Sequence, residues 1–103
     1  MNERELNTLL RRITPIAADV CAGDPDAPVL SGSRLYGYVL ARCFIVQALL
    51  DNGATYEEAA RLIGRNRTSI YHIFGRMRDI QRMPNVYRDD FMKWNTFKQL
   101  ING

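Results

Sequence analysis

Apolar residues recur every three or four positions along most of this chain, which is the spacing of one face of an α-helix. The pattern predicts an amphipathic helix over about residues 3–13. Thr14 and Pro15 then match the cap and the first residue of a short second helix. Residues 23–28 contain a glycine and two prolines, so we expect a loop there. We find no alternation of the kind that strands show.

The most apolar segment extends from about Arg34 to Leu50, with Ser33 as its predicted N-cap. It is apolar on nearly every side, which predicts a helix that the others enclose at the centre of the core. A last helix is predicted over about residues 89–101. Its aromatic residues share one face, so we interpret them as core and not as a platform for stacking bases.

Between these segments, a glycine separates two further helices. Thr55 and Glu58 match the S/T-x-x-E capping box, which predicts a helix over residues 56–63. Gly64 can adopt the left-handed conformation and make a tight turn. The next helix is predicted from Asn66 or Arg67 to Gln81, with an inward face that comprises Ile70, Ile73, Phe74, Met77 and Ile80.

The sequence therefore predicts an all-α fold, a compact orthogonal helical bundle in one domain over residues 1–103. We expect a helix-turn-helix at about residues 55–82. Small Ala60 and branched Ile70 are suited to a close contact between its two helices. A helix-turn-helix presents its second helix to the major groove, so binding of double-stranded DNA is predicted. Helix pairs without DNA-binding function also exist, and a purely structural pair is the alternative.

The distribution of charge supports the DNA-binding hypothesis more than the formal net charge of +3 does. Residues 61–82 carry six arginines and one acidic residue, whereas residues 1–30 carry three arginines and five acidic residues. A one-sided basic patch is expected of a phosphate-binding face. The alternative is an ordinary solvated helix surface.

Candidate DNA contacts lie at the turn and on the second helix of the pair. Arg67 can bind guanine and Asn66 can bind adenine, although Asn66 can instead cap the helix. Thr68 and Ser69 can contact phosphates or thymine methyl groups. For His72, a phosphate or base contact and a plain surface or half-buried position are both open. The candidates from this segment are Arg65, Asn66, Arg67, Thr68, Ser69, Tyr71, His72 and Arg76.

Other functions find little support in the residues. Cys21 and Cys43 lack metal-ligand spacing, and with a single histidine we expect no metal and no cofactor. We interpret both thiols as buried and reduced in a cytoplasmic protein. The polar N-terminus is no signal peptide, and the apolar stretch around residues 35–50 contains Arg42 and is too short for a membrane. No nucleophile–base pair is evident, so we expect no enzyme.

Residues 64–72 (Gly-Arg-Asn-Arg-Thr-Ser-Ile-Tyr-His) resemble the Gly-Arg-Asp-His-Thr-Thr-Val-Leu-His signature of one bacterial family. This family is the C-terminal DNA-binding domain (domain IV) of the replication initiator DnaA. The resemblance extends weakly to residues 17–20, 40–42 and 89–91. It implies a Trp repressor-like fold in which the signature residues bind a short duplex site in the major groove. It also implies that Arg34 corresponds to a basic-loop arginine that contacts the minor groove or the backbone.

The chain differs from that family at several positions. Asn66 and Arg67 replace the family's Asp and His, and residues 24–33 are acidic to neutral where the family has an arginine-rich loop. The chain has no G-x-x-x-x-G-K-[ST] motif, so we expect no nucleotide. Met1 favours a stand-alone relative over a fragment.

The resulting prediction is sequence-specific binding of double-stranded DNA by a replication-, mobile-element- or transcription-related regulator. The alternative is a protein-interaction module on a degenerate helix-turn-helix, with a protein partner in place of DNA.

Overall fold

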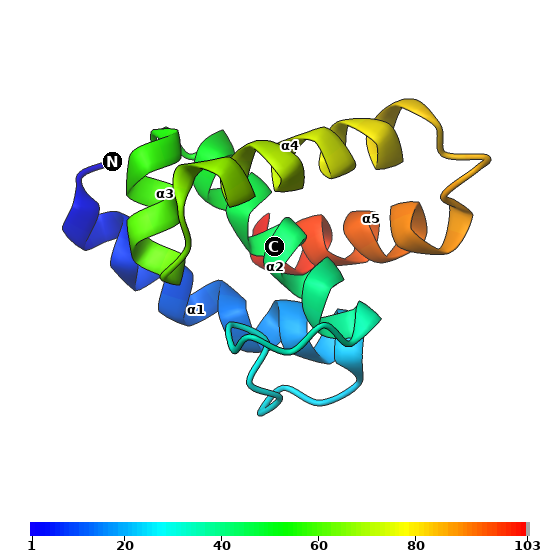
Figure 1. The fold of residues 1–103 in the computed structure, drawn as a ribbon. Coiled ribbons are helices and arrows are strands. Elements are labelled where there is room, and N and C mark those ends of the chain that lie inside the picture. Colours follow the sequence, from blue (N-terminus) through cyan, green and yellow to red (C-terminus); the bar gives the residue numbers. More distant parts are fainter. Residues whose placement is uncertain (103) are drawn as a thin grey trace.

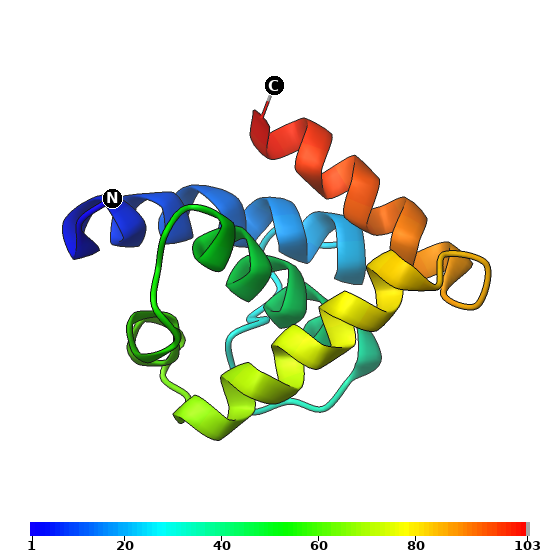
Figure 2. The same cartoon turned by 90° about the horizontal axis from the view of Figure 1, so that it is seen from above.

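The computed structural model describes residues 1–102, and this part of the chain contains five α-helices and no strand. The helices are α1 (Glu3–Ala22), α2 (Tyr36–Asp51), α3 (Tyr56–Ile63), α4 (Arg67–Arg82) and α5 (Arg88–Asn102). Helix α2 contacts each of the other four, and α1 and α4 lie on opposite sides of it (Figures 1 and 2). Helix α3 runs steeply across the start of α4 (Figure 1). The predicted all-α bundle is confirmed.

Helix α2 is enclosed, as its sequence predicts. Every residue from Leu40 to Leu49 is buried, so the helix presents no continuous solvent-facing stripe. Its first turn approaches the end of α1 very closely at Gly37. A Cβ atom at Gly37 would lie 2.5 Å from the carbonyl oxygen of Cys21, so only glycine fits there.

The predicted break in the first helix is wrong, because α1 continues through Thr14 and Pro15. The Thr14 hydroxyl donates to the Leu10 carbonyl at 2.6 Å and therefore does not cap a new helix. Proline inside a helix costs about 3 kcal/mol. Burial of one unbroken apolar face offsets that cost, and the face consists of Leu6, Leu9, Leu10, Ile13, Ala17, Ala18 and Cys21.

The predicted start of the central helix is also wrong. Helix α2 begins at Tyr36, and its N-cap residue Leu35 makes no side-chain capping bond. The hydroxyl of Ser33 instead accepts from the backbone N–H of Leu35 at 3.3 Å, inside an irregular segment. Residues 23–35 therefore form one long loop, and Arg34 belongs to it.

The predicted capping box of α3 and the glycine turn between α3 and α4 are confirmed. The Thr55 hydroxyl accepts from the Glu58 N–H at 3.1 Å, and the Glu58 carboxylate accepts from the Thr55 N–H at 2.9 Å. Gly64 has a φ of 71°, so the left-handed turn is present. The Asn66 side chain caps α4 by accepting from the Ser69 N–H at 2.8 Å.

The predicted core faces of the last two helices are largely confirmed. Ile70, Met77 and Ile80 of α4 are buried and Ile73 is partly buried, whereas Phe74 is exposed, against the prediction. In α5, Trp94 and Phe97 are buried against the ring of Phe44, with centroid separations of 5.1 and 5.5 Å. These α5 aromatic side chains are core, as expected, and are inaccessible to bases.

Both cysteines are free and buried. Burial raises the pKa of Cys21 from 9.0 to about 12 and that of Cys43 from 9.0 to about 11. Both thiols are therefore protonated in the native protein at neutral pH. Within residues 1–102, no helix combines the length and the apolar character needed to cross a membrane.

The stability of the protein should fall as the pH rises from about 9 to about 11. In this window the thiols of the unfolded chain ionise whereas the native thiols keep their protons, so the native state binds more protons. Each thiol contributes about 1.4 kcal/mol of lost stability per pH unit. Urea unfolding at several pH values measures this dependence. The Cys21→Ala/Cys43→Ala variant should show a shallower decline, and an identical decline would contradict the assignment.

Candidate nucleic-acid interface

The first turn of α4 faces solvent, directly after the Gly64 turn. Asn66, Arg67 and Thr68 are exposed, and the N-cap bond of Asn66 orders the helix start. Thr68, His72 and Gly75 share one outer face because they are spaced by four and three residues. The end of a helix that carries unpaired N–H groups is therefore presented outward, which favours an anion.

A hollow of about 430 Å³ opens beside this turn, between α4, α2 and the loop that precedes α2. We name it the N-terminal hollow, and it is lined by Arg34, Val39, Arg42, Arg65, Ser69, His72 and Ile73. Four of these residues are predicted DNA contacts: Arg34, Arg65, Ser69 and His72. The described residues that line the hollow include three arginines and no acidic side chain, so an anion is favoured there. Asp24 and Asp26 are not among them.

Arg42 is a buried arginine that sequence reasoning missed as part of the site. Only 8% of its surface is exposed, and its guanidinium donates to the carbonyls of Val29, Ser31 and Ser33 at 3.0, 2.7 and 2.7 Å. Burial lowers the pKa of Arg42, and the positive charge of Arg65 lowers it further. A charged residue inside an apolar run was the available signal, because a buried charge requires hydrogen-bond partners.

Arg65 connects the turn between α3 and α4 to the same loop. Its Nη2 donates to the Ser31 carbonyl at 2.7 Å, so this carbonyl accepts from both Arg65 and Arg42. Arg34 follows three residues later and is exposed. The turn between α3 and α4 and the loop before α2 are therefore physically joined beside the N-terminal hollow.

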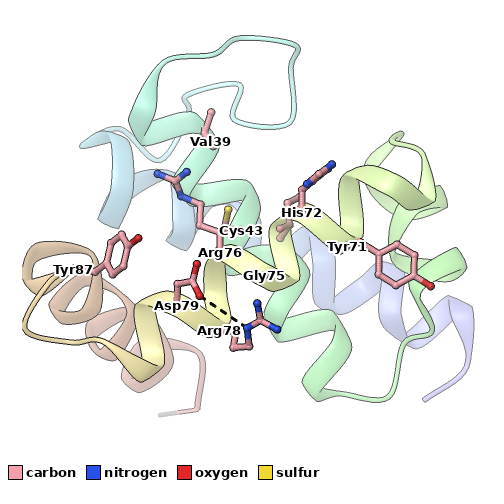
Figure 3. Close-up of a pocket in the computed structure, with 10 residues that line it drawn as sticks. Val39, Cys43, Tyr71, His72, Gly75, Arg76, Arg78, Asp79 and Tyr87 are labelled. Atoms are coloured by element: carbon pink, nitrogen blue, oxygen red, sulfur yellow. Dashed lines mark ion pairs between the residues drawn. The ribbon is translucent and has the colours of Figure 1, made fainter.

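A second hollow, of about 530 Å³, lies along the middle of α4, and we name it the central hollow (Figure 3). Its lining residues are Val39, Cys43, Tyr71, His72, Ile73, Gly75, Arg76, Arg78, Asp79 and Tyr87. His72 lines both hollows. In Figure 3 the imidazole of His72 points toward the loop, whereas Tyr71 points to the other side of α4. The two hollows thus meet at Val39, His72 and Ile73.

Arg76 is held at the central hollow by a group from α2. Its guanidinium lies over the Tyr36 ring, 5.3 Å from the centroid, and the Tyr36 hydroxyl raises the pKa of Arg76. The Tyr36 hydroxyl donates to the buried carboxylate of Asp90. Burial, and then this bond to Asp90, raises the pKa of Tyr36, so the phenol keeps its proton. Three helices therefore fix the position of the Arg76 side chain.

Arg67 and Tyr71 lie on the opposite flank of α4. The Arg67 guanidinium is 3.3 Å from the Glu57 carboxylate and 5.7 Å from the centroid of the Tyr71 ring. Tyr71 in turn packs edge-on against Tyr56, with centroids 4.7 Å apart. An exposed ion pair of this kind contributes under about 1 kcal/mol. Arg67 can therefore leave Glu57 at little cost when a better acceptor approaches.

The arginines of residues 61–82 do not all share one face. Arg61 pairs with Glu3 of α1 at 2.7 Å, away from the hollows. Arg82 lines a separate hollow together with Phe74 and Gln47. The basic surface beside the hollows therefore draws on Arg65, Arg76 and Arg78, and Arg34 from the loop extends it. Arg78 lies 3.9 Å from the carboxylate of Asp79, which lines the central hollow as well.

Neither a metal-binding cluster within residues 1–102 nor a similar protein indicates a function for this chain. No group of three or more histidine, cysteine or acidic side chains is placed to hold a metal ion in the described part of the chain. Searches against protein-family models, curated proteins and solved structures found no match. The exposed start of α4 and the two hollows beside it, which contain several arginines, are therefore the candidate functional surface.

Gly75 is expected to lower the stability of the isolated protein. A Cβ atom at Gly75 would meet no atom within 4 Å, so packing inside the protein does not require glycine. Gly75→Ala should therefore stabilise the fold by about 1 kcal/mol and raise Tm by roughly 4–8 °C. Thermal unfolding followed by circular dichroism measures the shift. Gly64→Ala is the matched control and should lower Tm, because its φ of 71° is unfavourable for alanine. A decrease for Gly75→Ala would refute the expectation.

Proposed function

We propose that this protein binds double-stranded DNA sequence-specifically, with the first turn of α4 in the major groove. The observation that carries the proposal is the exposed, capped start of α4 beside a hollow lined by Arg34, Arg42 and Arg65. The major groove is wide enough to admit an α-helix, and phosphates border it on both sides. A helix end flanked by arginines matches that arrangement.

In this proposal, the side of α4 beside the N-terminal hollow contacts the phosphate backbone. Arg34 and Arg65 supply charge, and Ser69 and His72 line the same hollow and supply hydrogen-bonding groups. Arg76 extends this flank along the helix. Such contacts position the protein on the duplex but carry little sequence information.

Base recognition is assigned to the outer face and the opposite flank of α4. Arg67 is the strongest candidate, because a bidentate pair with guanine discriminates by about 1–3 kcal/mol. That exceeds the cost of releasing Arg67 from Glu57. Thr68 is exposed next to it. Asn66 contributes less to this proposal, because its side-chain oxygen already accepts from the N–H and the hydroxyl of Ser69.

The biological role that we infer is regulation of replication, of a mobile element or of transcription. The support is the resemblance of residues 64–72 to the signature of the DnaA DNA-binding domain. The same resemblance supports the assignment of Arg34 to the DNA-binding surface.

One observation favours a protein-interaction module as the second candidate. Tyr71 and Phe74 are 50% and 36% exposed, and both pack against Tyr56 on one flank of α4. Exposed aromatic side chains are enriched at protein interfaces. This candidate predicts a stable protein complex that Tyr71→Ala disrupts, together with no binding of duplex DNA at low salt.

Binding to a pool of random duplexes should weaken steeply with salt. If several arginines neutralise phosphates, the log–log slope of affinity against salt should be roughly −3 to −6. Selection of the bound duplexes over successive rounds should yield a shared sequence. Fluorescence anisotropy with the selected duplex measures the slope. Failure of every duplex to bind at low salt would refute DNA binding.

Two arginine variants should separate backbone contact from base recognition. Arg34→Ala should weaken all duplexes alike and make the salt slope less negative by about 1, because one phosphate contact is lost. Arg67→Ala should change the preferred sequence, because a base contact is lost. Repeated selection and salt titration with each variant measure both effects.

The matched control for these variants is Arg11→Ala. Arg11 is also exposed, but it belongs to α1, on the far side of α2 from α4 (Figures 1 and 2). This variant should leave both affinity and sequence preference unchanged. Equal effects of Arg11→Ala and Arg34→Ala would show that α4 does not dock as proposed.

A further inference from the structure

We propose that Arg42 is a positioning residue for DNA binding, which fixes Arg34 relative to the first turn of α4. The inference rests on the proposed function of that surface. Its basis is the bonding of the Arg42 guanidinium, which donates to the backbone carbonyls of Val29, Ser31 and Ser33. Arg42 thus holds the loop up to the residue that precedes Arg34.

The three acceptors define the path of the loop. They alternate along the chain at residues 29, 31 and 33, and the planar guanidinium reaches all of them from one side. The loop adds only short-range bonds of its own here, such as that of the Ser31 N–H to the Pro28 carbonyl at 3.0 Å. The long-range hydrogen bonds of this segment therefore come from Arg42, joined at Ser31 by Arg65, and Val29 is also buried in the core.

The shared acceptor extends this order to the helix-turn-helix. The Ser31 carbonyl also accepts from Arg65, which follows the Gly64 turn. Arg42 of α2 and Arg65 of the turn are therefore joined through one loop carbonyl. The distance between Arg34 and the start of α4 is set by this junction, so a duplex that contacts both meets them in a fixed register.

The Arg42→Lys variant distinguishes the effect of holding the loop in place from the effect of the positive charge on residue 42. Arg42→Lys keeps the positive charge but loses the planar two-armed donor, so it cannot hold the three carbonyls in the same geometry. An effect of charge alone would leave this variant like the original protein. An effect of position would make it resemble Arg34→Ala, because Arg34 would no longer be held at the DNA.

The experiment is a double-mutant cycle with the selected duplex, using Arg42→Lys, Arg34→Ala and the double variant. Arg42→Lys should weaken binding roughly fivefold to tenfold, as the loss of one charge-assisted contact does. The double variant should bind about as well as Arg34→Ala alone, because Arg42 acts through Arg34. Amide hydrogen exchange without DNA should accelerate at Ser31 and Leu35 in Arg42→Lys.

If Arg42→Lys fails to fold, Arg42→Met, which keeps an apolar stem but removes the charge, still tests the exchange at Ser31 and Leu35 and the dependence on Arg34 in the cycle. Multiplicative losses in the cycle, or unchanged exchange at Ser31 and Leu35, would overturn the role of Arg42 while DNA binding stands. Failure of the original protein to bind any duplex would overturn both proposals. The two failures are therefore distinguishable.

Discussion

The apolar surface of α2 has to be removed from water on every side, and this requirement arranges the rest of the molecule. A helix with ten successive buried residues, Leu40 to Leu49, needs neighbours all around it. The other four helices supply them, and each therefore commits one face to the core. The outer side of α4 and the loop that precedes α2 stay exposed in this arrangement, and the candidate site lies there. The candidate site is thus a consequence of how the central helix is covered.

Arg42 is the exception within that helix. A buried guanidinium costs several kcal/mol in lost hydration unless its N–H groups find acceptors. In this protein the acceptors are neutral loop carbonyls, so the desolvated charge organises a segment that has no helix or strand of its own. The charge of Arg65 lies close enough to lower the pKa of Arg42 further. The described residues that line the N-terminal hollow thus include arginines and no acidic side chain, so the hollow favours binding of an anion. This agrees with the proposed phosphate contacts.

Local signals predicted the α3–α4 helix pair and its turn well, because capping and turn chemistry act over three or four residues. Thr55 and Gly64 are examples, since each makes the interaction that its position in the sequence indicates. The break at Pro15 was predicted wrongly, because burial of one long apolar face outweighed the local cost of proline. Arg42 bonds to loop carbonyls nine or more residues away, and Tyr36 bonds to Asp90 of another helix. Periodicity and spacing carry no signal for such pairs.

The loop before α2 consists of two halves that differ in how they are attached. Around Asp24 the backbone bonds only to its immediate neighbours, with Asp26 and Ala27 donating back to Asp24. Around Ser31 it is fastened to α2 and to the helix-turn-helix by two arginines. Extra residues or a fused peptide are consequently best tolerated near Asp24. The same insertion near Ser31 would detach Arg34 from the rest of the surface, so the first half of the loop is the place to add a label or a tether.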